Sequence, residues 1–295
     1  MASEKPVIQI RLKMNASLLD YIKSGSLYAL PHHAISRVVY KLTRIESPVV
    51  VPVIKGFARV FKVDLSEAKQ PEPESYKSFN AFFTREIKPE LRPIADTAIV
   101  SPVDGTVSQS GAINAGRIFQ AKGQDYTVQE LLACDDAMAE SFANGQFLTI
   151  YLSPRDYHRM HMPFKGHLTE QVHVPGRLFS VAPHTVKTVS RIFARNERVV
   201  AHFDTDYGRM AMVLVGAINV AAIETVWDGL VTPPKGKTIS RKAYAVGDVT
   251  LDKGQELGRF NMGSTIVMLM ESKSPELSKS LIEGLPVKMG QAFSD

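Results

Sequence analysis

The sequence predicts an α+β fold in which an N-terminal subdomain of basic amphipathic helices precedes a mostly antiparallel β domain. Apolar residues recur at helical spacing up to residue 62, and a polar stretch with two prolines follows at 64–75. Beyond it, short apolar runs alternate with Gly and Pro, as strands and turns do. The 295 residues, 44% of them hydrophobic and 22% charged, are typical of a folded globular protein. We therefore expect a helical segment at 1–63, a linker at 64–75 and a β-rich domain at 76–295.

Two amphipathic helices are expected between Pro31 and Lys62, with an interruption at Pro48. In each helix the apolar residues share one face and the basic residues share another. Such helices suit the surface of an anionic membrane, but the pattern also fits helices that pack on the main domain and leave a basic face in solvent. The apolar positions are Ile35, Val38, Val39, Leu42, Val53, Ile54, Phe57, Val60 and Phe61, and the basic positions are Arg37, Lys41, Arg44, Lys55, Arg59 and Lys62.

The positive charge of the protein is concentrated at its N-terminal end. The formal net charge is +5, but residues 1–62 carry ten Lys or Arg against three Asp or Glu, which is +7, so the other 233 residues sum to −2. Residues 1–15 lack the apolar stretch of a signal peptide, and we expect none. The longest apolar stretch, 210–223, is too short to span a membrane and is broken by Gly216 and Asn219, which predicts two strands joined by a bend. We expect neither a transmembrane helix nor a nucleic-acid partner.

The β-rich domain contains one predicted helix among its strands. Thr127-Val128-Gln129-Glu130 is a capping-box pattern, and we expect the helix that it opens to run to about Asn144-Gly145. Strands are expected within residues 98–109, 146–154, 166–176, 198–204, 208–227 and 264–270.

Three clusters along the chain could hold reactive groups. Asp104 precedes Gly105 in a turn between two predicted strands. His158 and His161 are three residues apart in a segment bounded by prolines, and Ser264 stands just ahead of a strongly apolar run. Asp, His and Ser are the residue types of general acid–base and nucleophilic catalysis.

Each cluster also has a simpler explanation. Asp-Gly is common in Asx turns, and a buried structural role is plausible for one of the histidines. Two histidines at this spacing could bind a metal, but no third ligand is evident and the single cysteine, Cys134, lies elsewhere, so we expect no metal. Ser264, His161 and Asp104 could form a hydrolase triad, although the G-x-S-x-G nucleophile elbow is missing. The residues alone leave a hydrolase open.

Seven segments, in this order, carry a resemblance to a known family: SPVDG, QAKGQDYTVQELL, TIYLSPRDYHRMHMPFKG, VPGRLFSV, IFARNERV, VGAINVAAIETVW and GRFNMGSTIVML. From about residue 76 to residue 270 the chain closely resembles bacterial phosphatidylserine decarboxylases, and its basic N-terminal helices are similar too. The cleavage tetrapeptide of that family is usually Leu-Gly-Ser-Thr, and here it is Met262-Gly263-Ser264-Thr265. Because Met and Leu are close in size and apolarity, we expect no functional consequence.

The resemblance implies that the chain cleaves itself between Gly263 and Ser264. The products would be a large β chain, 1–263, and a small α chain, 264–295. Ser264 would be converted into a covalent pyruvoyl group, which is the cofactor of the family. Glycine suits this position because it leaves the carbonyl open to attack.

The resemblance also assigns roles to the reactive residues. Ser264 would be the nucleophile of the self-cleavage, His161 its base, and Asp104 the group that orients His161. The amine of phosphatidylserine would then form a Schiff base with the pyruvoyl group, and His158 would act as general acid after CO2 leaves. The product would be phosphatidylethanolamine.

The resemblance further implies a peripheral protein on the cytoplasmic side of the cell membrane. Its expected partners are phosphatidylserine, an anionic membrane surface and its own two cleavage products, held together as a heterodimer that pairs further. Two alternatives remain: a serine hydrolase that uses Ser264, His161 and Asp104 without self-cleavage, and an inactive lipid-binding domain.

Overall fold

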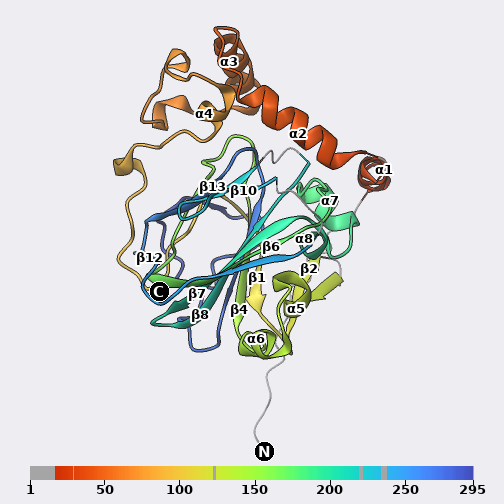
Figure 1. The fold of residues 1–295 in the computed structure, drawn as a ribbon, viewed down its shortest axis with the longest axis vertical. Helices are drawn as coiled ribbons and strands as arrows, with labels where there is room; N and C mark the ends of the chain where they lie inside the picture. The colour runs from red at the N-terminus through yellow and green to blue at the C-terminus, as the bar shows by residue number, and fades with distance from the viewer. Residues whose placement is uncertain (1–16, 29, 122–123, 219–221, 234–237, 295) are drawn as a thin grey trace, which may run out of the picture.

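The computed structural model describes residues 17–28, 30–121, 124–218, 222–233 and 238–294. It confirms the α+β class, because N-terminal helices stand on one side of a body built mainly from antiparallel strands (Figure 1). The expectations for residues 1–15 and for Asn219 concern positions outside the described residues.

The described helices lie in two regions of the chain. The N-terminal layer contains α1 Leu18–Leu27, α2 His32–Thr43, α3 Val50–Phe61 and α4 Phe79–Phe83, with 3-10 turns η1 Leu65–Glu67, η2 Pro73–Ser75 and η3 Pro89–Leu91. The β domain contains α5 Val128–Leu132, α6 Asp136–Ser141, α7 Pro183–Thr188 and α8 Ile192–Arg195.

The described strands form three sheets. The nine-stranded sheet has the order β11-β6-β7-β8-β14-β4-β1-β15, with β12 also paired to β6. The four-stranded sheet has the order β10-β9-β13-β5, and β2 pairs with β3. Their bounds are β1 Gly105–Ala112, β2 Arg117–Ala121, β3 Gln124–Thr127, β4 Gln146–Tyr151, β5 Arg159–His161, β6 Gly166–Val174, β7 Arg198–Thr205, β8 Gly208–Val215, β9 Ile223–Thr225, β10 Gly229–Thr232, β11 Ser240–Ala243, β12 Thr250–Leu251, β13 Glu256–Phe260, β14 Thr265–Met270 and β15 Pro286–Val287.

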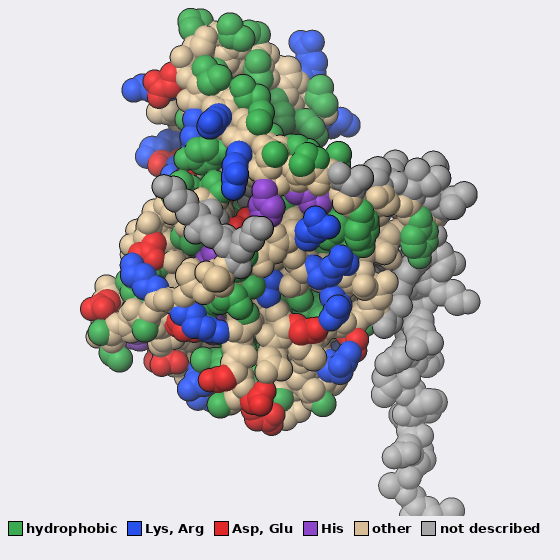
Figure 2. Space-filling view, turned by 45° about the vertical axis from the view of Figure 1, so that its right-hand side comes forward, with side chains coloured by type: hydrophobic (Ala, Val, Ile, Leu, Met, Phe, Trp, Pro, Cys, Tyr) green, Lys and Arg blue, Asp and Glu red, His purple; other side chains and the backbone are tan. Residues whose placement is uncertain are grey.

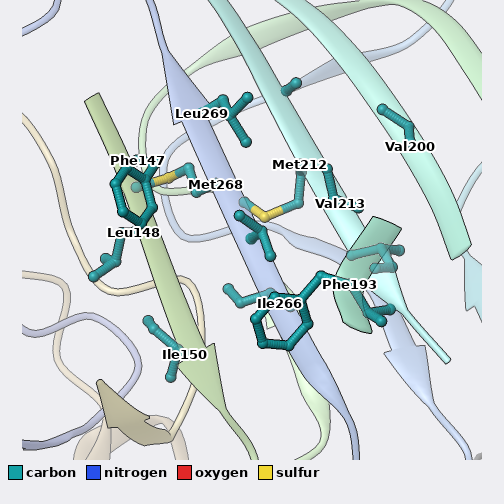
Figure 3. Packing of buried hydrophobic residues seen from close by; sticks show 14 of the residues in the cluster. Phe147, Leu148, Ile150, Phe193, Val200, Met212, Val213, Ile266, Met268 and Leu269 are labelled. Atoms are coloured by element: carbon teal, nitrogen blue, oxygen red, sulfur yellow. The ribbon is translucent and has the colours of Figure 1, made fainter. Parts of the chain in front are cut away.

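Strand β14 lies in the centre of the large sheet. It pairs along its whole length with β8 on one side and β4 on the other, and all six of its residues are buried. Figure 3 shows Ile266, Met268 and Leu269 between the side chains of these neighbouring strands. A strand covered on both faces has no polar alternation, which is why its sequence is continuously apolar. The residue just before it, Ser264, is therefore tied to the most protected part of the core.

The predicted helix after Thr127 is shorter than expected. The capping box is confirmed, since the Thr127 hydroxyl accepts from the Glu130 amide and the Glu130 carboxylate accepts from the Thr127 amide. The helix ends at Leu132, because Ala133 adopts a left-handed conformation with φ of 50°. Asp135 then caps a second helix, α6, through the amide of Met138. The single helix to Asn144-Gly145 was therefore wrong, because a turn and a second cap interrupt it.

The two expected N-terminal helices are confirmed as α2 and α3, and α1 precedes them. The bend in 210–223 is confirmed in its described part, where β8 ends at Val215 and β9 begins at Ile223. Residues 76–83, at the start of the expected β-rich domain, contact the N-terminal helices: Tyr76, Phe79, Phe82 and Phe83 share a buried cluster with Val50 and Ile54 of α3.

Helix α2 leaves part of its apolar side exposed to solvent. Its buried residues are His32, Ser36 and Thr43, whereas Val38 and Leu42 are 55% and 59% exposed. The exposed apolar surface of the N-terminal layer continues through α3 and consists of Val38, Leu42, Ile45, Val49, Val53, Val60 and Phe61. Figure 2 shows hydrophobic and basic side chains together over this end of the molecule. Contiguous exposed apolar side chains of this kind mark an interaction surface.

Among the described helices, none combines the length and the hydropathy that a bilayer crossing requires.

Candidate active site

The scissile bond predicted from the sequence lies where the chain passes from β13 into β14. Ser264 is fully buried, and its carbonyl oxygen accepts a 2.8 Å hydrogen bond from the amide of Leu152 at the end of β4. The hydroxyl of Ser264 has no hydrogen-bond partner among the described residues. A buried hydroxyl without a partner is costly and calls for a reason. Here it leaves a nucleophilic oxygen free beside the Gly263 peptide.

Gly263 makes close approaches that a larger residue would disturb. A Cβ at this position would lie 3.2 Å from the carbonyl oxygen of Leu152 and 3.6 Å from Cε1 of His158. His158 therefore stands directly beside the scissile bond. The absence of a side chain at Gly263 is what allows the loop that carries His158 to come this close.

Two backbone hydrogen bonds fix the loop that carries His158. Leu152 donates to Ser264 at 2.8 Å, and the amide of Phe260 donates to the carbonyl of His158 at 3.0 Å. Within the loop, the Asp156 carboxylate accepts from the amide and the hydroxyl of Ser153. The loop 152–158 is thus held against the segment 260–264 at both ends.

The ring of His158 is fully buried and electrically neutral at pH 7. Burial and, to a smaller extent, the positive charge of Arg85 lower its pKa to about 3, while the carbonyls of Ser153 and Pro154 oppose the shift. Neither ring nitrogen makes a hydrogen bond with a described residue. The ring stacks on Phe83, with centroids 4.2 Å apart and an interplanar angle of 20°. Both nitrogens of His158 are therefore free to take up or release a proton.

His161 is held by two hydrogen bonds. Its Nδ1 lies 2.9 Å from the carbonyl oxygen of Gly254, and its Nε2 lies 3.1 Å from the hydroxyl of Tyr157. Because a carbonyl can only accept, Nδ1 carries the proton and Nε2 accepts from Tyr157. Burial lowers the pKa of His161, although the bond to Gly254 opposes this. The ring is thus neutral and oriented by Tyr157 and Gly254.

Asp104 is buried in an ion-pair network. Arg92 donates to its carboxylate from Nε at 2.9 Å and from Nη2 at 2.6 Å, and the amide of Met289 donates at 2.8 Å. Lys288 lies 3.5 Å away, and Arg92 also binds Glu67. These charge-assisted hydrogen bonds compensate the carboxylate for its burial. Asp104 lines a polar cavity of about 270 Å³ that does not include Ser264.

The structure brings some of the predicted site residues together and keeps others apart. His158 lies against Gly263, the residue that precedes Ser264 in the chain. The backbone of His161 lies near that of Asp104, since the amide of His161 donates a hydrogen bond to the carbonyl of Pro102. Among the described residues, however, no hydrogen bond joins His161 to Asp104, and none joins either of them to Ser264. The triad expected from the resemblance stays a prediction.

Sequence reasoning missed several residues of this site: Phe83, Arg92, Gly254 and Tyr157. Only Tyr157 had a signal, because it stands four residues before His161 in the same short segment. The others come from segments that the topology brings together and that carry no motif of their own.

A largely apolar cavity of about 300 Å³ opens onto Gly263. One wall comes from the N-terminal helices, with Val39, Phe57 and Phe61, and another from Phe83 and Met262. A larger cavity of about 550 Å³, beside Cys134 and His202, contains none of the predicted site residues. The cavity at Gly263 is therefore the one that can present an apolar ligand to the reactive residues.

Groups of three or more His, Cys, Asp or Glu residues arranged to hold a metal are absent from the part of the chain that the structure describes. Cys134 is half-buried, and burial raises the pKa of its thiol to about 11.

Comparisons with known proteins identify the family of the chain. The sequence profile of the family described as phosphatidylserine decarboxylase matches residues 79–294, and a second profile, described as PSD, matches residues 22–62. A protein of Alkalilimnicola ehrlichii named phosphatidylserine decarboxylase proenzyme is 57% identical over 262 residues, which are 88% of this chain and 91% of that protein. Proteins of the same name from Shewanella frigidimarina and Shewanella loihica are each 52% identical over 283 residues, or 94% of this chain and 98% and 99% of theirs. The chain belongs to the phosphatidylserine decarboxylase family.

Proposed function

We propose that the chain cleaves itself between Gly263 and Ser264 and then decarboxylates phosphatidylserine to phosphatidylethanolamine. The observation that supports this most directly is the buried hydroxyl of Ser264, which makes no hydrogen bond with a described residue. The preceding residue, Gly263, lies against His158, whose ring nitrogens also make no hydrogen bond with a described residue. The names of the relatives, which include the word proenzyme, agree with self-cleavage.

The proposed cleavage uses only groups of the chain and water. The Ser264 oxygen adds to the Gly263 carbonyl and loses its proton to a base, the C–N bond breaks, and the serine nitrogen takes up a proton, which leaves an ester. Loss of the Ser264 α-proton then breaks the Cβ–O bond and releases Gly263 as a carboxylate. The dehydroalanine that remains takes up one water and loses one ammonia to give the pyruvoyl group.

Residue 264 suits a small keto group. Its carbonyl is bound to Leu152, and the six residues after it are paired on both sides in the sheet, so the end of the small chain stays in place after cleavage. A pyruvoyl carbonyl supplies an electron sink for breaking a carbon–carbon bond. His158 lies beside this position, and its nitrogens have no competing partners.

We assign His158 the proton transfers of decarboxylation, as the resemblance implies. Its low pKa in the uncleaved chain means that it must take up a proton before it can donate one. We assign His161 the role of base in self-cleavage, and Asp104 the role of orienting His161. For that role His161 must exchange its bonds to Tyr157 and Gly254 for bonds to Asp104 and Ser264.

The N-terminal layer is proposed to place the enzyme on a membrane that contains phosphatidylserine. Its exposed apolar surface is flanked by the exposed basic residues Arg37, Lys41, Arg59 and Lys62. Apolar side chains at the level of the headgroups and basic side chains near anionic lipid both favour peripheral binding. Because the same helices line the cavity at Gly263, a lipid bound there would be close to the reactive residues. The cytoplasmic side of the cell membrane is the proposed location, and pairs of cleaved molecules are the proposed assembly.

Intact-mass measurement of the purified protein tests the proposal. We expect two chains, residues 1–263 and residues 264–295, with the small one lighter by one ammonia than the same peptide with an N-terminal serine. Ser264→Ala is expected to remain one chain of full length without decarboxylase activity. Decarboxylation of phosphatidylserine by that variant would contradict the proposal.

The two alternatives give different results in the same preparation. An uncleaved wild-type chain whose Ser264 reacts with a fluorophosphonate would indicate a serine hydrolase. An uncleaved chain that binds phosphatidylserine vesicles but does not react would indicate a lipid-binding domain.

The roles of the two histidines can be separated by comparing His158→Gln with His161→Gln. We expect His161→Gln to stay uncleaved and His158→Gln to be cleaved but unable to decarboxylate. The comparison separates the two roles, because His158 rather than His161 lies beside the proposed scissile bond in the uncleaved chain. If His158→Gln stays uncleaved while His161→Gln is cleaved, His158 is the base.

A further inference from the structure

His158 has an unusual environment for a residue that must be positioned accurately. Its ring is fully buried, yet neither nitrogen is hydrogen-bonded to a described residue. His161, three residues later, is oriented by two hydrogen bonds. A histidine that transfers protons to a substrate cannot have both nitrogens occupied by the protein. Its orientation therefore depends on contacts with the faces of the ring, in addition to the nearby carbonyls of Ser153 and Pro154.

Phe83 provides such a contact. Its ring is 1% exposed and lies nearly parallel to the ring of His158, with centroids 4.2 Å apart. An aromatic ring on the face of an imidazole restricts its tilt and leaves both nitrogens free. Phe83 ends helix α4, which packs with the N-terminal helices, so this contact reaches His158 from the N-terminal layer.

Phe83 is itself held by other rings. Phe79 lies 6.2 Å away in a stacked arrangement, and Phe57 of α3 lies 6.1 Å away edge-on. The same cluster includes Val50 and Ile54 of α3 and contacts Met262, the residue before Gly263. A close-packed cluster transmits small displacements because it has little free volume. The position of α3 is thereby linked to both His158 and the cleavage site.

We propose that Phe83 is a positioning residue that sets the plane of the His158 ring, and that the aromatic cluster ties this plane to helix α3. The N-terminal helices would then belong to the reaction centre in addition to contacting lipid. The kinetic part of the proposal rests on the proposed function, because it assumes that His158 transfers a proton during decarboxylation.

Phe83→Leu is the variant that removes the stacked ring and keeps an apolar side chain. Phe82→Leu is the matched control for burial, because Phe82 is fully buried in the same helix and cluster and its ring does not stack on His158. Phe61→Leu is the matched control for the cavity, since Phe61 lines the space at Gly263 without contacting His158. Phe83→Met, which changes the volume less, serves if Phe83→Leu does not fold.

The kinetic result expected is a fall of about tenfold or more in kcat for Phe83→Leu or Phe83→Met, with KM within about twofold of wild type. Phe82→Leu is expected to lose thermal stability to a similar degree and to keep kcat within about twofold. Equal kcat values for Phe83→Leu and Phe82→Leu would overturn the proposal, as would a loss confined to KM and shared with Phe61→Leu.

A second measurement does not depend on decarboxylation. In uncleaved Ser264→Ala protein, the ring-proton NMR signals of His158 can be assigned by their loss in an additional His158→Gln variant. The ring current of Phe83 should shift them upfield, and Phe83→Leu should abolish the shift while Phe82→Leu preserves it. Absence of the shift in the Ser264→Ala protein would overturn the proposal even if the enzyme is active. If the upfield shift is present but the wild-type protein is inactive, the proposed function is wrong, whereas the stacking of Phe83 on His158 is supported.

Discussion

The amide of Leu152 donates a 2.8 Å hydrogen bond to the carbonyl oxygen of Ser264. This bond lies on the C-terminal side of the scissile peptide, as do all the ladder bonds of β14 with β4 and β8. Cleavage before Ser264 would break none of them. The end of the small chain would therefore be held by the same contacts before and after the proposed cleavage.

We predict that the chain 264–295 stays bound to the chain 1–263 after cleavage. All six residues of β14 are buried between two strands of the large chain, and removing them would expose the centre of the core. The two chains should elute together in native size-exclusion chromatography and separate only in denaturant. Recovery of the large chain alone from a native column would show that β14 does not anchor the small chain.

Gly263→Ala should slow self-cleavage by about tenfold or more, because accurate placement of the reacting groups contributes at least that much to the rate. The added methyl group would lie only 3.2 Å from the Leu152 carbonyl oxygen, which is closer than an ordinary contact, so the backbone at Leu152 or Gly263 must shift by a few tenths of an ångström. The appearance of the two chains on a denaturing gel, followed over time, measures this.

Gly111→Ala is the control for that substitution. Its methyl group would meet only a Phe147 ring carbon at 3.6 Å, which is an ordinary contact in strand β1. It should cleave at the wild-type rate. Equal cleavage rates for Gly263→Ala and wild type would show that the close approach at Gly263 has no part in the reaction.

Arg92→Leu should destabilise the protein by about 3–5 kcal/mol, the usual cost of leaving a buried charge without its partner. Arg92 and Asp104 have side chains only 3% and 4% exposed, and Arg92 provides the shortest contacts to the carboxylate. Urea unfolding of Ser264→Ala protein, which we expect to be a single chain, gives the free energy.

Arg117→Leu provides the comparison for the buried pair. Arg117 and Asp125 form an ion pair whose side chains are 53% and 39% exposed, so its loss should cost less than about 1 kcal/mol. Adding Asp104→Asn to Arg92→Leu should recover part of the stability, because the uncompensated charge is then removed. No recovery in the double variant would argue against this cause.

Leu42→Glu and Val60→Glu should weaken binding to phosphatidylserine vesicles without changing self-cleavage. Leu42 and Val60 are 59% and 73% exposed on the N-terminal layer, so the substitutions remove apolar contact with lipid and add negative charge. Val246→Glu is the matched control, because Val246 is 94% exposed on the β domain. Vesicle sedimentation at low and high salt measures binding, and equal loss in all three variants would count against a specific membrane surface.

His202 should make the protein less stable as the pH falls. Burial, together with the positive charges of Arg241 and Arg209, lowers its pKa to about 4, whereas an unfolded histidine titrates near 6.5. Between these values the unfolded state binds the extra proton, so its free energy falls relative to the folded state as the pH is lowered. The loss is absent above about pH 6.5 and reaches about 3 kcal/mol near pH 4.

His202→Gln isolates this contribution. The free energies of unfolding of the variant and of wild type are measured by urea denaturation between pH 7 and pH 4. As the pH falls, the variant should lose less of its free energy of unfolding than wild type does. Parallel curves would mean that His202 titrates normally in the folded protein.

The sequence by itself determined the features that depend on near neighbours in the chain. The apolar run at β14, the amphipathic periods of α2 and α3 and the capping box at Thr127 are local patterns with local causes. The resemblance in turn pointed to Gly263 and Ser264, and the fold places them at the entrance to the central strand. The long helix after Thr127 was misjudged because the left-handed turn at Ala133 and the cap at Asp135 outweigh helical propensity.

Only the tertiary structure decided which side chains surround the reactive groups. Phe83 stacks on His158 across 75 positions of sequence, Arg92 reaches Asp104, and Gly254 binds His161 from a distant turn. The exposure of Val38 and Leu42 on α2 also required the structure, because a helical period shows that two faces of a helix differ and does not show which one is buried. Such contacts depend on how the strands and helices pack, and no single segment of the chain contains that information.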